Sequence, residues 1–146
     1  MLIRTISAKE MDRALQIIWE TFLQFEAPDF SQQGIDSFHD YISNKEIVES
    51  LEFFGAFYHN ELRGVIATND NGKHICCFFI SADYQKRGIG RQLWEYLKEN
   101  SGHAEFTVNS SPFAVPVYHR LGFADTDTEQ IANGIRYTPM KFTRSV

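Results

Sequence analysis

The chain has 146 residues, of which 43% are hydrophobic and 14% aromatic, so it can bury the core of one domain and is not a disordered polymer. A net charge of −5 at pH 7 argues against a nucleic-acid or anionic membrane surface as the main partner. No apolar run reaches the length of a membrane span, and the first residues lack the apolar core of a secretory signal, so we expect a cytoplasmic protein.

The first part of the chain is predicted to contain one strand and two helices. Residues 2–7 alternate as a short strand, and Ser7 with Glu10 forms the S-x-x-E pattern of a helix start. Apolar residues then recur at helical spacing to about Phe25, and Pro28 ends this helix. In a second helical stretch, the apolar side is formed by Ile35, Phe38 and Ile42.

From Leu51 the pattern becomes that of strands. Segments 51–60 and 61–70 are predicted to pair through a tight turn at His59–Glu61, and Asp70–Gly72 marks a second turn. Residues 73–81 form an almost continuous apolar run, which is typical of a central strand buried on both faces. The only two cysteines, Cys76 and Cys77, lie in this run, and we interpret them as small hydrophobic residues of a reduced protein.

The second half alternates between helices and strands. In chain order we predict a helix at about 88–100, a strand at 104–110, a short helix at 112–121, and strands at 122–130 and 135–142. A strand–helix–strand crossover joins parallel neighbours, so the sheet should be mixed. We therefore predict a single domain over residues 1–146, of the α/β (α+β) class, with a mostly antiparallel central sheet of about six to seven strands and helices on both faces.

Two glycines, Gly88 and Gly90, lie between the apolar strand and the following helix. They would let a ligand approach backbone N–H groups at a helix N-terminus, which is an arrangement suited to a phosphate or pyrophosphate. Lys86, Arg87 and Arg91 add positive charge to this segment of an acidic protein. The third glycine of a dinucleotide loop and the Gly-Lys-Ser/Thr of a Walker loop are absent. Taken alone, the two glycines fit an ordinary strand–helix turn equally well.

Further residues extend this pattern into a family motif. Gln85-x-x-Gly88-x-Gly90 follows the apolar strand, and Asn109 and the segment Tyr118-His119-Arg120-Leu121-Gly122-Phe123 come later. With these motifs the sequence resembles a bacterial-type member of the GCN5-related N-acetyltransferase (GNAT) family over nearly its whole length. The resemblance implies the GNAT-like acyl-CoA N-acyltransferase fold. It also implies transfer of the acetyl group from acetyl-CoA, as co-substrate, to a primary amine without a metal.

The resemblance assigns the cofactor-binding residues. The loop whose backbone amides hold the CoA pyrophosphate would comprise Gln85, Lys86, Arg87, Gly88, Ile89, Gly90 and Arg91. The preceding strand is expected to carry a bulge whose backbone pairs with the pantetheine arm and polarises the thioester, at Phe78, Phe79 and Ile80. This strand and the next are expected to separate like an open V. Asn109 would bind the pantetheine arm there or, alternatively, cap the next helix.

The resemblance also assigns the chemistry. Tyr118 would protonate the CoA thiolate after direct attack by the amine. Candidates for the base that accepts the proton of the amine are Glu52, His119, Asp36 and His39, and bound water or bulk buffer could serve instead. Aromatic and acidic residues of the first two helices could hold a cationic amine, although an aromatic stripe at helical spacing is more often core: Trp19, Phe22, Phe25, Phe30, Phe38, Tyr41, Glu26, Asp29, Asp36 and Asp40.

Several alternatives stay open from the sequence. The acceptor is expected to be a small-molecule or peptide amine, and a homodimer is open because dimers are common in the family. A non-catalytic CoA-binding or sensing domain of the same fold is the main alternative to an enzyme. A third is a site for a different phosphate-containing nucleotide.

Overall fold

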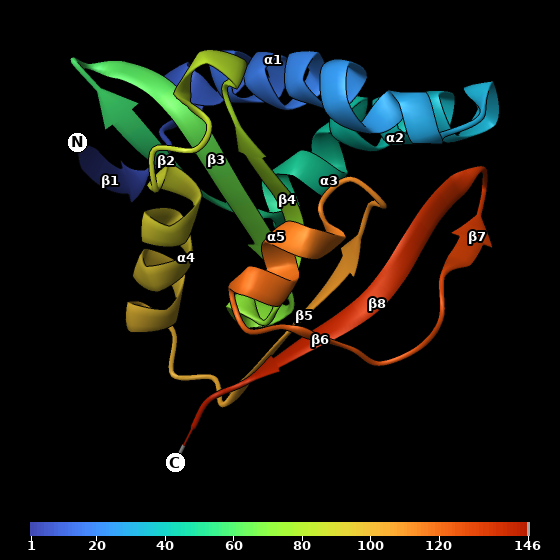
Figure 1. Ribbon diagram of the computed structural model, residues 1–146. Helices are drawn as coiled ribbons and strands as arrows, with labels where there is room; N and C mark the ends of the chain where they lie inside the picture. The colour runs from blue at the N-terminus through green and yellow to red at the C-terminus, as the bar shows by residue number, and fades with distance from the viewer. Residues whose placement is uncertain (146) are drawn as a thin grey trace.

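A mixed, mostly antiparallel eight-stranded sheet forms the centre of the computed structural model, which describes residues 1–145 (Figure 1). One half is an antiparallel run of β1 (Leu2–Thr5), β2 (Glu52–Tyr58), β3 (Glu61–Asn69) and β4 (His74–Ile80). The other half contains β5 (Glu105–Ser110), β8 (Ile135–Thr143), β6 (Ala124–Asp125) and β7 (Gln130–Ala132). The fold class is therefore as predicted, with more strands than expected.

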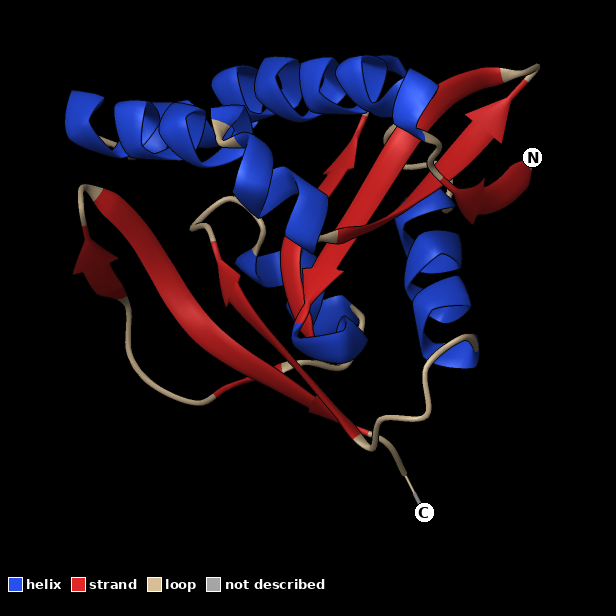
Figure 2. Ribbon diagram, turned by 180° about the vertical axis from the view of Figure 1, so that it is seen from behind, coloured by secondary structure: helices blue, strands red, loops and turns tan. Residues whose placement is uncertain are grey.

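The helices lie on both faces of the sheet (Figures 1 and 2). Their bounds are Met11–Thr21 (α1), Gln32–Ser43 (α2), Lys45–Ser50 (α3), Ile89–Glu99 (α4) and Val115–Arg120 (α5). Val65 and Ile66 are adjacent on β3, and their side chains point to opposite faces. Val65 joins the core beneath α1 and α2, whereas Ile66 joins the core beneath α4 and α5. No helix within residues 1–145 combines the length and the hydrophobicity that crossing a bilayer would require.

Local signals in the sequence define most element ends correctly. The Ser7 backbone N–H donates to Glu10 Oε1 at 2.9 Å in the predicted capping box. Three hairpin turns use residues with positive φ, at His59–Asn60, at the predicted turn Asp70–Gly72 and at Asn133–Gly134. Gly122, with φ of 101°, follows the end of α5, where glycine is the residue that most often ends a helix. The predictions failed to identify α3, which begins after Asn44 accepts a hydrogen bond from the Ile47 N–H.

The predicted strand at 122–130 is wrong. The chain pairs with β8 only in the short segments β6 and β7. Between them residues 127–129 leave the ladder, and the Asp127 carboxylate accepts a hydrogen bond from the backbone N–H of Thr128. The predicted helix at 112–121 likewise begins later, at Val115, after a turn in which Ser111 accepts a hydrogen bond from the Ala114 N–H.

Strand β4 differs from the expected strand that is buried on both faces. Ile75, Cys77 and Phe79 are buried, whereas Cys76, Phe78 and Ile80 are only half-buried. The register with β3 shifts between Ile75 and Cys77, which leaves Cys76 as an extra, bulged residue. A bulge bends its strand and disturbs the ladder. The expected bulge at Phe78–Ile80 is thus located earlier in the strand, at Cys76.

Candidate active site

The sheet splits between β4 and β5. These two strands pair in parallel at only two positions, His74 with Thr107 and Ile75 with Val108. Their separation begins directly at the bulged Cys76, after which β4 continues to pair with β3 alone. The expected V-shaped opening is therefore present, and the bulge explains where it starts.

The separated edge of β4 exposes backbone hydrogen-bonding groups toward the opening. Ser81 N–H donates to Arg63 O at 2.8 Å, so Ser81 faces β3. Backbone groups alternate in direction along an antiparallel ladder, and those of Phe78 and Ile80 consequently point away from β3. The Gln85 side chain donates to Ile80 O at 3.1 Å, which agrees with this direction. The backbone of Phe79 faces β3, so of the three expected pantetheine partners only Phe78 and Ile80 offer free groups. At Ile80 the free group is the N–H, because its carbonyl already accepts from Gln85.

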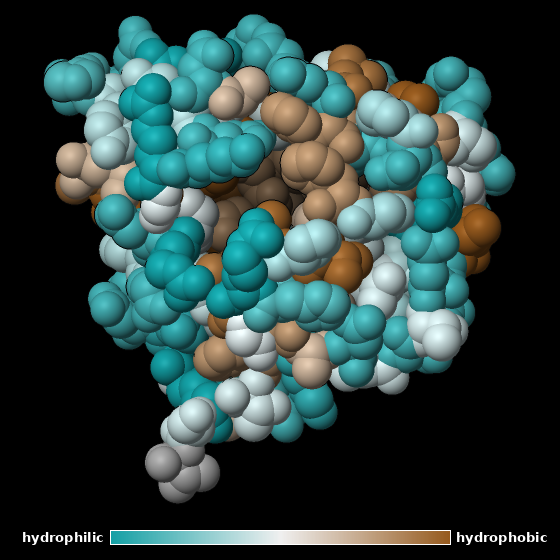
Figure 3. All heavy atoms as spheres, viewed as in Figure 1, coloured by the Kyte–Doolittle hydropathy of each residue, from teal (hydrophilic) through white to brown (hydrophobic). Residues whose placement is uncertain are grey.

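A cavity of about 450 Å³ lies along the separated part of β4, between the end of α1, the N-terminus of α4 and α5. Its wall contains most of the residues predicted for cofactor binding and catalysis: Phe78, Phe79, Ile80, Gln85, Lys86, Gly88, Ile89, Gly90, Arg91 and Tyr118. In the space-filling view this face is hollowed over β4, with hydrophobic side chains in the hollow and hydrophilic ones around it (Figure 3). The loop and the tyrosine, which are far apart in the sequence, thus belong to one site.

The N-terminus of α4 forms one end of this cavity. Gly88 is its N-cap with φ of 83°, and Lys86 also has a positive φ of 61°. The Gln92 N–H is bonded to Gly88 O, whereas the first N–H groups of a helix have no acceptor within the helix. The N–H groups of Ile89, Gly90 and Arg91 belong to this first turn, where the helix dipole also favours an anion.

Gly90 has no structural reason to be glycine. Its φ is not positive, and a Cβ built on it would meet only side-chain atoms at ordinary contact distance, the nearest being the Phe78 ring at 3.6 Å. Glycine within a helix costs about 1 kcal/mol relative to alanine. A glycine at this position leaves the backbone open to close approach by a ligand in the cavity, which fits the diphosphate of CoA.

Two predicted cofactor residues lie outside the cavity. Arg87 stacks its guanidinium over the Tyr84 ring, 4.6 Å from the ring centre, at the rim of the loop. Asn109 is exposed and pairs with Pro139 across β5 and β8. The cap of the turn after β5 is Ser111 rather than Asn109. The role of Asn109 in pantetheine binding stays a prediction.

Tyr118 closes the bottom of the cavity from α5. Its side chain is 6% exposed and packs edge-on against Phe78, with ring centres 6.0 Å apart, and against Phe123. Burial raises the pKa of the phenol, and the nearby Glu26 carboxylate and Cys77 thiol raise it further. The phenol therefore keeps its proton at neutral pH, as a proton donor must.

Glu26 enters the same cavity from the other side. It is the last residue of a π-helical turn, Phe22–Glu26, that follows α1. Burial raises the pKa of its carboxyl group to about 7; a hydrogen bond with the Ser111 hydroxyl opposes this shift and the charge of Asp29 adds to it. Sequence analysis placed Glu26 only among acids that could hold an amine, and did not identify it as a base.

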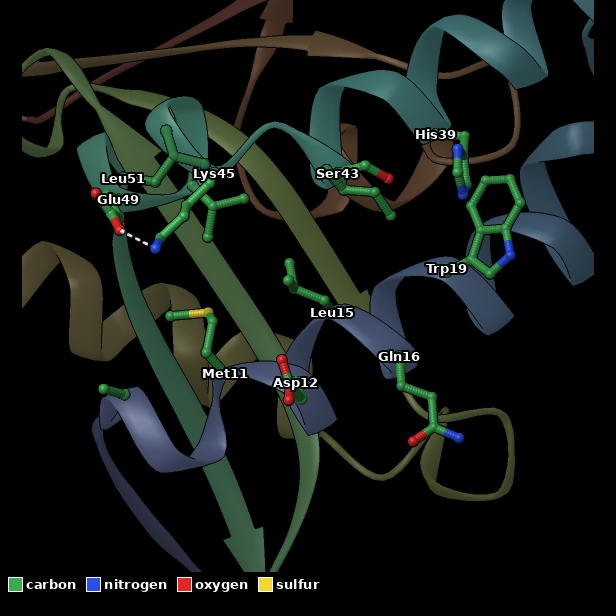
Figure 4. Close-up of a pocket in the computed structure, with 13 residues that line it drawn as sticks. Met11, Asp12, Leu15, Gln16, Trp19, His39, Ser43, Lys45, Glu49 and Leu51 are labelled. Carbon is green, nitrogen blue, oxygen red and sulfur yellow. Dashed lines mark ion pairs between the residues drawn. The ribbon is translucent and has the colours of Figure 1, made fainter.

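The base candidates from the sequence lie elsewhere. Glu52 is exposed at the start of β2, and Asp36 accepts a hydrogen bond from Gln32 on the surface of α2. His119 Nε2 is bonded to Asp125 Oδ1 at 2.7 Å, also on the surface. His39 lies edge-on to Trp19 in a second cavity, which is separate from the split in the sheet (Figure 4). None of these four lines the cavity that holds Tyr118.

The second cavity measures about 790 Å³ and lies between α1, α2 and α3. Met11 and Leu15 line its apolar part, and the ion pair between Lys45 and Glu49 lies at one side (Figure 4). No residue of the family motif lines this second cavity. Within residues 1–145 there is also no group of three or more His, Cys, Asp and Glu side chains placed to hold a metal.

Most aromatic residues of the first two helices pack in the core. Trp19, Phe22, Phe30, Phe38 and Tyr41 all belong to or pack against the cluster beneath α1 and α2. Phe25 is different, because it lines the cavity beside Glu26 and stacks on Phe113 with ring centres 5.1 Å apart. The interpretation of the aromatic stripe as core is thus confirmed for all but Phe25.

A mixed sheet that splits beside a helix N-terminus, with a tyrosine close to the opening, is the arrangement that the resemblance to the GNAT family implies. The sequence model described as "Acetyltransferase (GNAT) domain" matches residues 26–144, which is most of the chain. The chain therefore belongs to the GNAT acetyltransferase family.

Solved structures show the same fold. A GCN5-related N-acetyltransferase from Rhodopseudomonas palustris superimposes with a TM-score of 0.82 at 17% identity, covering 98% of this chain and 95% of that one. The PaiA N-acetyltransferase from Thermoplasma acidophilum, solved in complex with coenzyme A, gives a TM-score of 0.77 at 20% identity over 98% of both chains.

A curated relative is more similar in sequence but longer. The UPF0157 protein YqkA of Bacillus subtilis (strain 168) is 31% identical over 98 residues, which cover 62% of this chain. The match covers 29% of YqkA, so the chain corresponds to less than a third of that protein.

Proposed function

We propose that the protein transfers the acetyl group of acetyl-CoA to a primary amine by direct attack of the amine nitrogen on the thioester. The observation that carries this proposal is the combination, in one cavity, of a helix N-terminus with free N–H groups and a buried phenol. The family membership and the CoA-bound structural neighbour support it.

Different residues of the cavity would bind different parts of acetyl-CoA. The first-turn N–H groups of α4 and the positive charge of Lys86 and Arg91 would hold the diphosphate of acetyl-CoA. The free backbone groups of Phe78 and Ile80 would pair with the pantetheine arm as an added strand would, and a backbone N–H there would stabilise the tetrahedral oxyanion.

Tyr118 would then complete the reaction. Collapse of the tetrahedral intermediate breaks the C–S bond and releases a thiolate, which takes the phenolic proton. A non-catalytic CoA sensor would have no use for a proton donor at sulfur, so the placement of this phenol in the cavity favours the enzyme over that alternative.

Release of free CoA thiol tests the proposal directly. Wild-type protein is incubated with acetyl-CoA and a panel of monoamines, polyamines, amino acids and short peptides, and thiol is measured against a no-amine control. We expect amine-dependent release, which Tyr118→Phe lowers by about 10²-fold without weakening CoA binding. CoA binding without thiol release across the panel would support the sensor, and a melting temperature raised by ATP or NAD but not by CoA would support another nucleotide site.

A further inference from the structure

Acetyl transfer needs a neutral amine, yet most alkyl amines are protonated at neutral pH, with pKa values of about 10. The proposed function therefore raises the question of what accepts the first proton. Among residues 1–145, Glu26 is the only carboxylate that lines the cavity of Tyr118. The basic side chains of this cavity, Lys86, Arg91 and Arg120, belong to the α4 loop and α5.

Glu26 lines the cavity together with Lys86, Arg91 and Arg120 but forms no ion pair with any of them. Its titratable neighbours are Tyr118 from α5, Cys77 from β4 and Asp29 from the next turn, and the Ser111 hydroxyl is its hydrogen-bond partner. No ion pair involves Glu26 in the part of the chain that the structure describes. A desolvated carboxylate without a cation is costly by itself and is stabilised when a cationic ligand binds beside it.

Glu26 and Tyr118 reach the cavity from separate elements. Glu26 comes from the turn after α1 and Tyr118 comes from α5, and the Glu26 carboxylate is near enough to raise the pKa of the Tyr118 phenol. A thioester bound beside Tyr118 would thus have a carboxylate within the same cavity, available to the attacking nitrogen.

We propose that Glu26 binds the ammonium group of the acceptor and removes its proton before the nitrogen attacks the thioester. This inference rests on the proposed acetyl transfer and names the group that the sequence could not identify. A carboxyl group whose pKa is about 7 is ionised at slightly alkaline pH and is a stronger base than an exposed glutamate.

The protons balance in the following way. The ammonium group gives one proton to Glu26, and the neutral nitrogen forms the C–N bond. The C–S bond then breaks, and the thiolate takes the proton of Tyr118. The proton that the new C–N centre loses restores the phenol, while Glu26 releases its proton to solvent. The products are the amide, CoA thiol and one proton.

The variant Glu26→Gln tests this role, with Glu20→Gln as a matched control on the exposed side of α1. Both variants are first titrated with CoA, and we expect affinities equal to that of the wild type. With an alkyl amine at pH 7, Glu26→Gln should lose about 10²-fold in kcat/KM, while Glu20→Gln should keep the wild-type value.

The pH profile separates a base from a merely structural residue. Wild-type kcat/KM should rise with pH until the pH passes the pKa of Glu26, which is about 7. It should then stay level until the amine itself deprotonates. Without a base only the neutral amine reacts, so kcat/KM of Glu26→Gln should increase about tenfold per pH unit up to the amine pKa. Trifluoroethylamine, which is already neutral at pH 7, should react equally well with both proteins.

The outcomes separate the two claims. An active wild type together with a Glu26→Gln variant of unchanged profile would refute the role of Glu26 and leave acetyl transfer intact. A variant that is equally impaired with trifluoroethylamine would also refute it, because that substrate needs no base. A wild type that releases no thiol with any amine would refute acetyl transfer, and the role of Glu26 with it.

Discussion

At the scale of single residues, most functional groups of the site can be identified from the sequence, but the base Glu26 cannot. Gly88, Gly90 and Tyr118 carry a motif with fixed spacing, and the structure brings them to one cavity. Glu26 lies beyond the α-helical part of its segment. A π-helical turn has more residues per turn than an α-helix, so it rotates Glu26 away from the direction that helical periodicity predicts.

Burial of the Glu26 carboxylate lowers the free energy of unfolding by an amount that stability measurements can detect. Burial raises the pKa of its carboxyl group from 4.5 to about 7 in the folded protein. Below pH 4.5 the carboxyl group is protonated in both the folded and the unfolded protein. Between pH 4.5 and about 7 it ionises in the unfolded chain but stays protonated in the folded protein, so the free energy of unfolding falls as the pH rises through this range.

We therefore expect Glu26→Gln to melt close to the wild type at pH 4.5 and to become more stable than the wild type at pH 8. A shift of this size corresponds to about 1–3 kcal/mol once partial solvent access is considered. Thermal unfolding of both proteins across this pH range measures the difference. If the difference in melting temperature between the two proteins does not change with pH, the Glu26 carboxyl group is not desolvated.

At the scale of elements, the C-terminal hairpin shows a contact that no periodicity predicts. Gly34 of α2 packs directly on Gly134 of the β7–β8 turn, and Ser37 Oγ donates to Asn133 O at 2.9 Å beside it. A Cβ on Gly34 would lie 2.2 Å from the Gly134 carbonyl oxygen. This close approach between backbones holds the hairpin against the helix.

Because of this contact, replacing Gly34 by alanine should have the opposite effect on stability from the same substitution at an ordinary helical glycine. Gly→Ala within a helix ordinarily stabilises by up to about 1 kcal/mol, but here α2 or the hairpin must move. We expect Gly34→Ala to lower the free energy of unfolding by about 1–3 kcal/mol in urea titrations. Gly102→Ala, where the added Cβ meets nothing within 4 Å, should change it by less than about 0.5 kcal/mol. A Gly34→Ala variant as stable as the wild type would contradict this packing.

The prediction of elements succeeded where local signals are strong. Capping residues, turn residues and the change from helical to alternating period define most helices and strands. The prediction failed where tertiary pairing decides. Residues 122–130 are predicted as one strand, yet only the short segments β6 and β7 pair with β8. The position of the β4 bulge likewise depends on its partner β3, which no pattern within β4 reveals.

At the scale of the whole molecule, function follows from a sheet that holds two cores together while it opens in the middle. The core beneath α1–α2 packs on one face of β2–β4, and the core beneath α4–α5 joins these strands to β5 and β8 on the other face. The bulge at Cys76 marks the point where β4 separates from β5. The cavity in this split lies at the N-terminus of α4, where N–H groups and basic side chains favour an anion in a protein of net charge −5.

The central claim is that backbone amides of the first turn of α4 hold the diphosphate of CoA, and calorimetric titration with CoA of Gly90→Tyr and Gly102→Tyr tests it most directly. Both substitutions place the same side chain at a glycine without positive φ and with no backbone atom close to the new Cβ. Gly90→Tyr should fold cooperatively but lose at least about 100-fold in affinity, equivalent to about 2.8 kcal/mol, while Gly102→Tyr binds like the wild type. A folded Gly90→Tyr protein that binds CoA as tightly as the wild type would contradict the account.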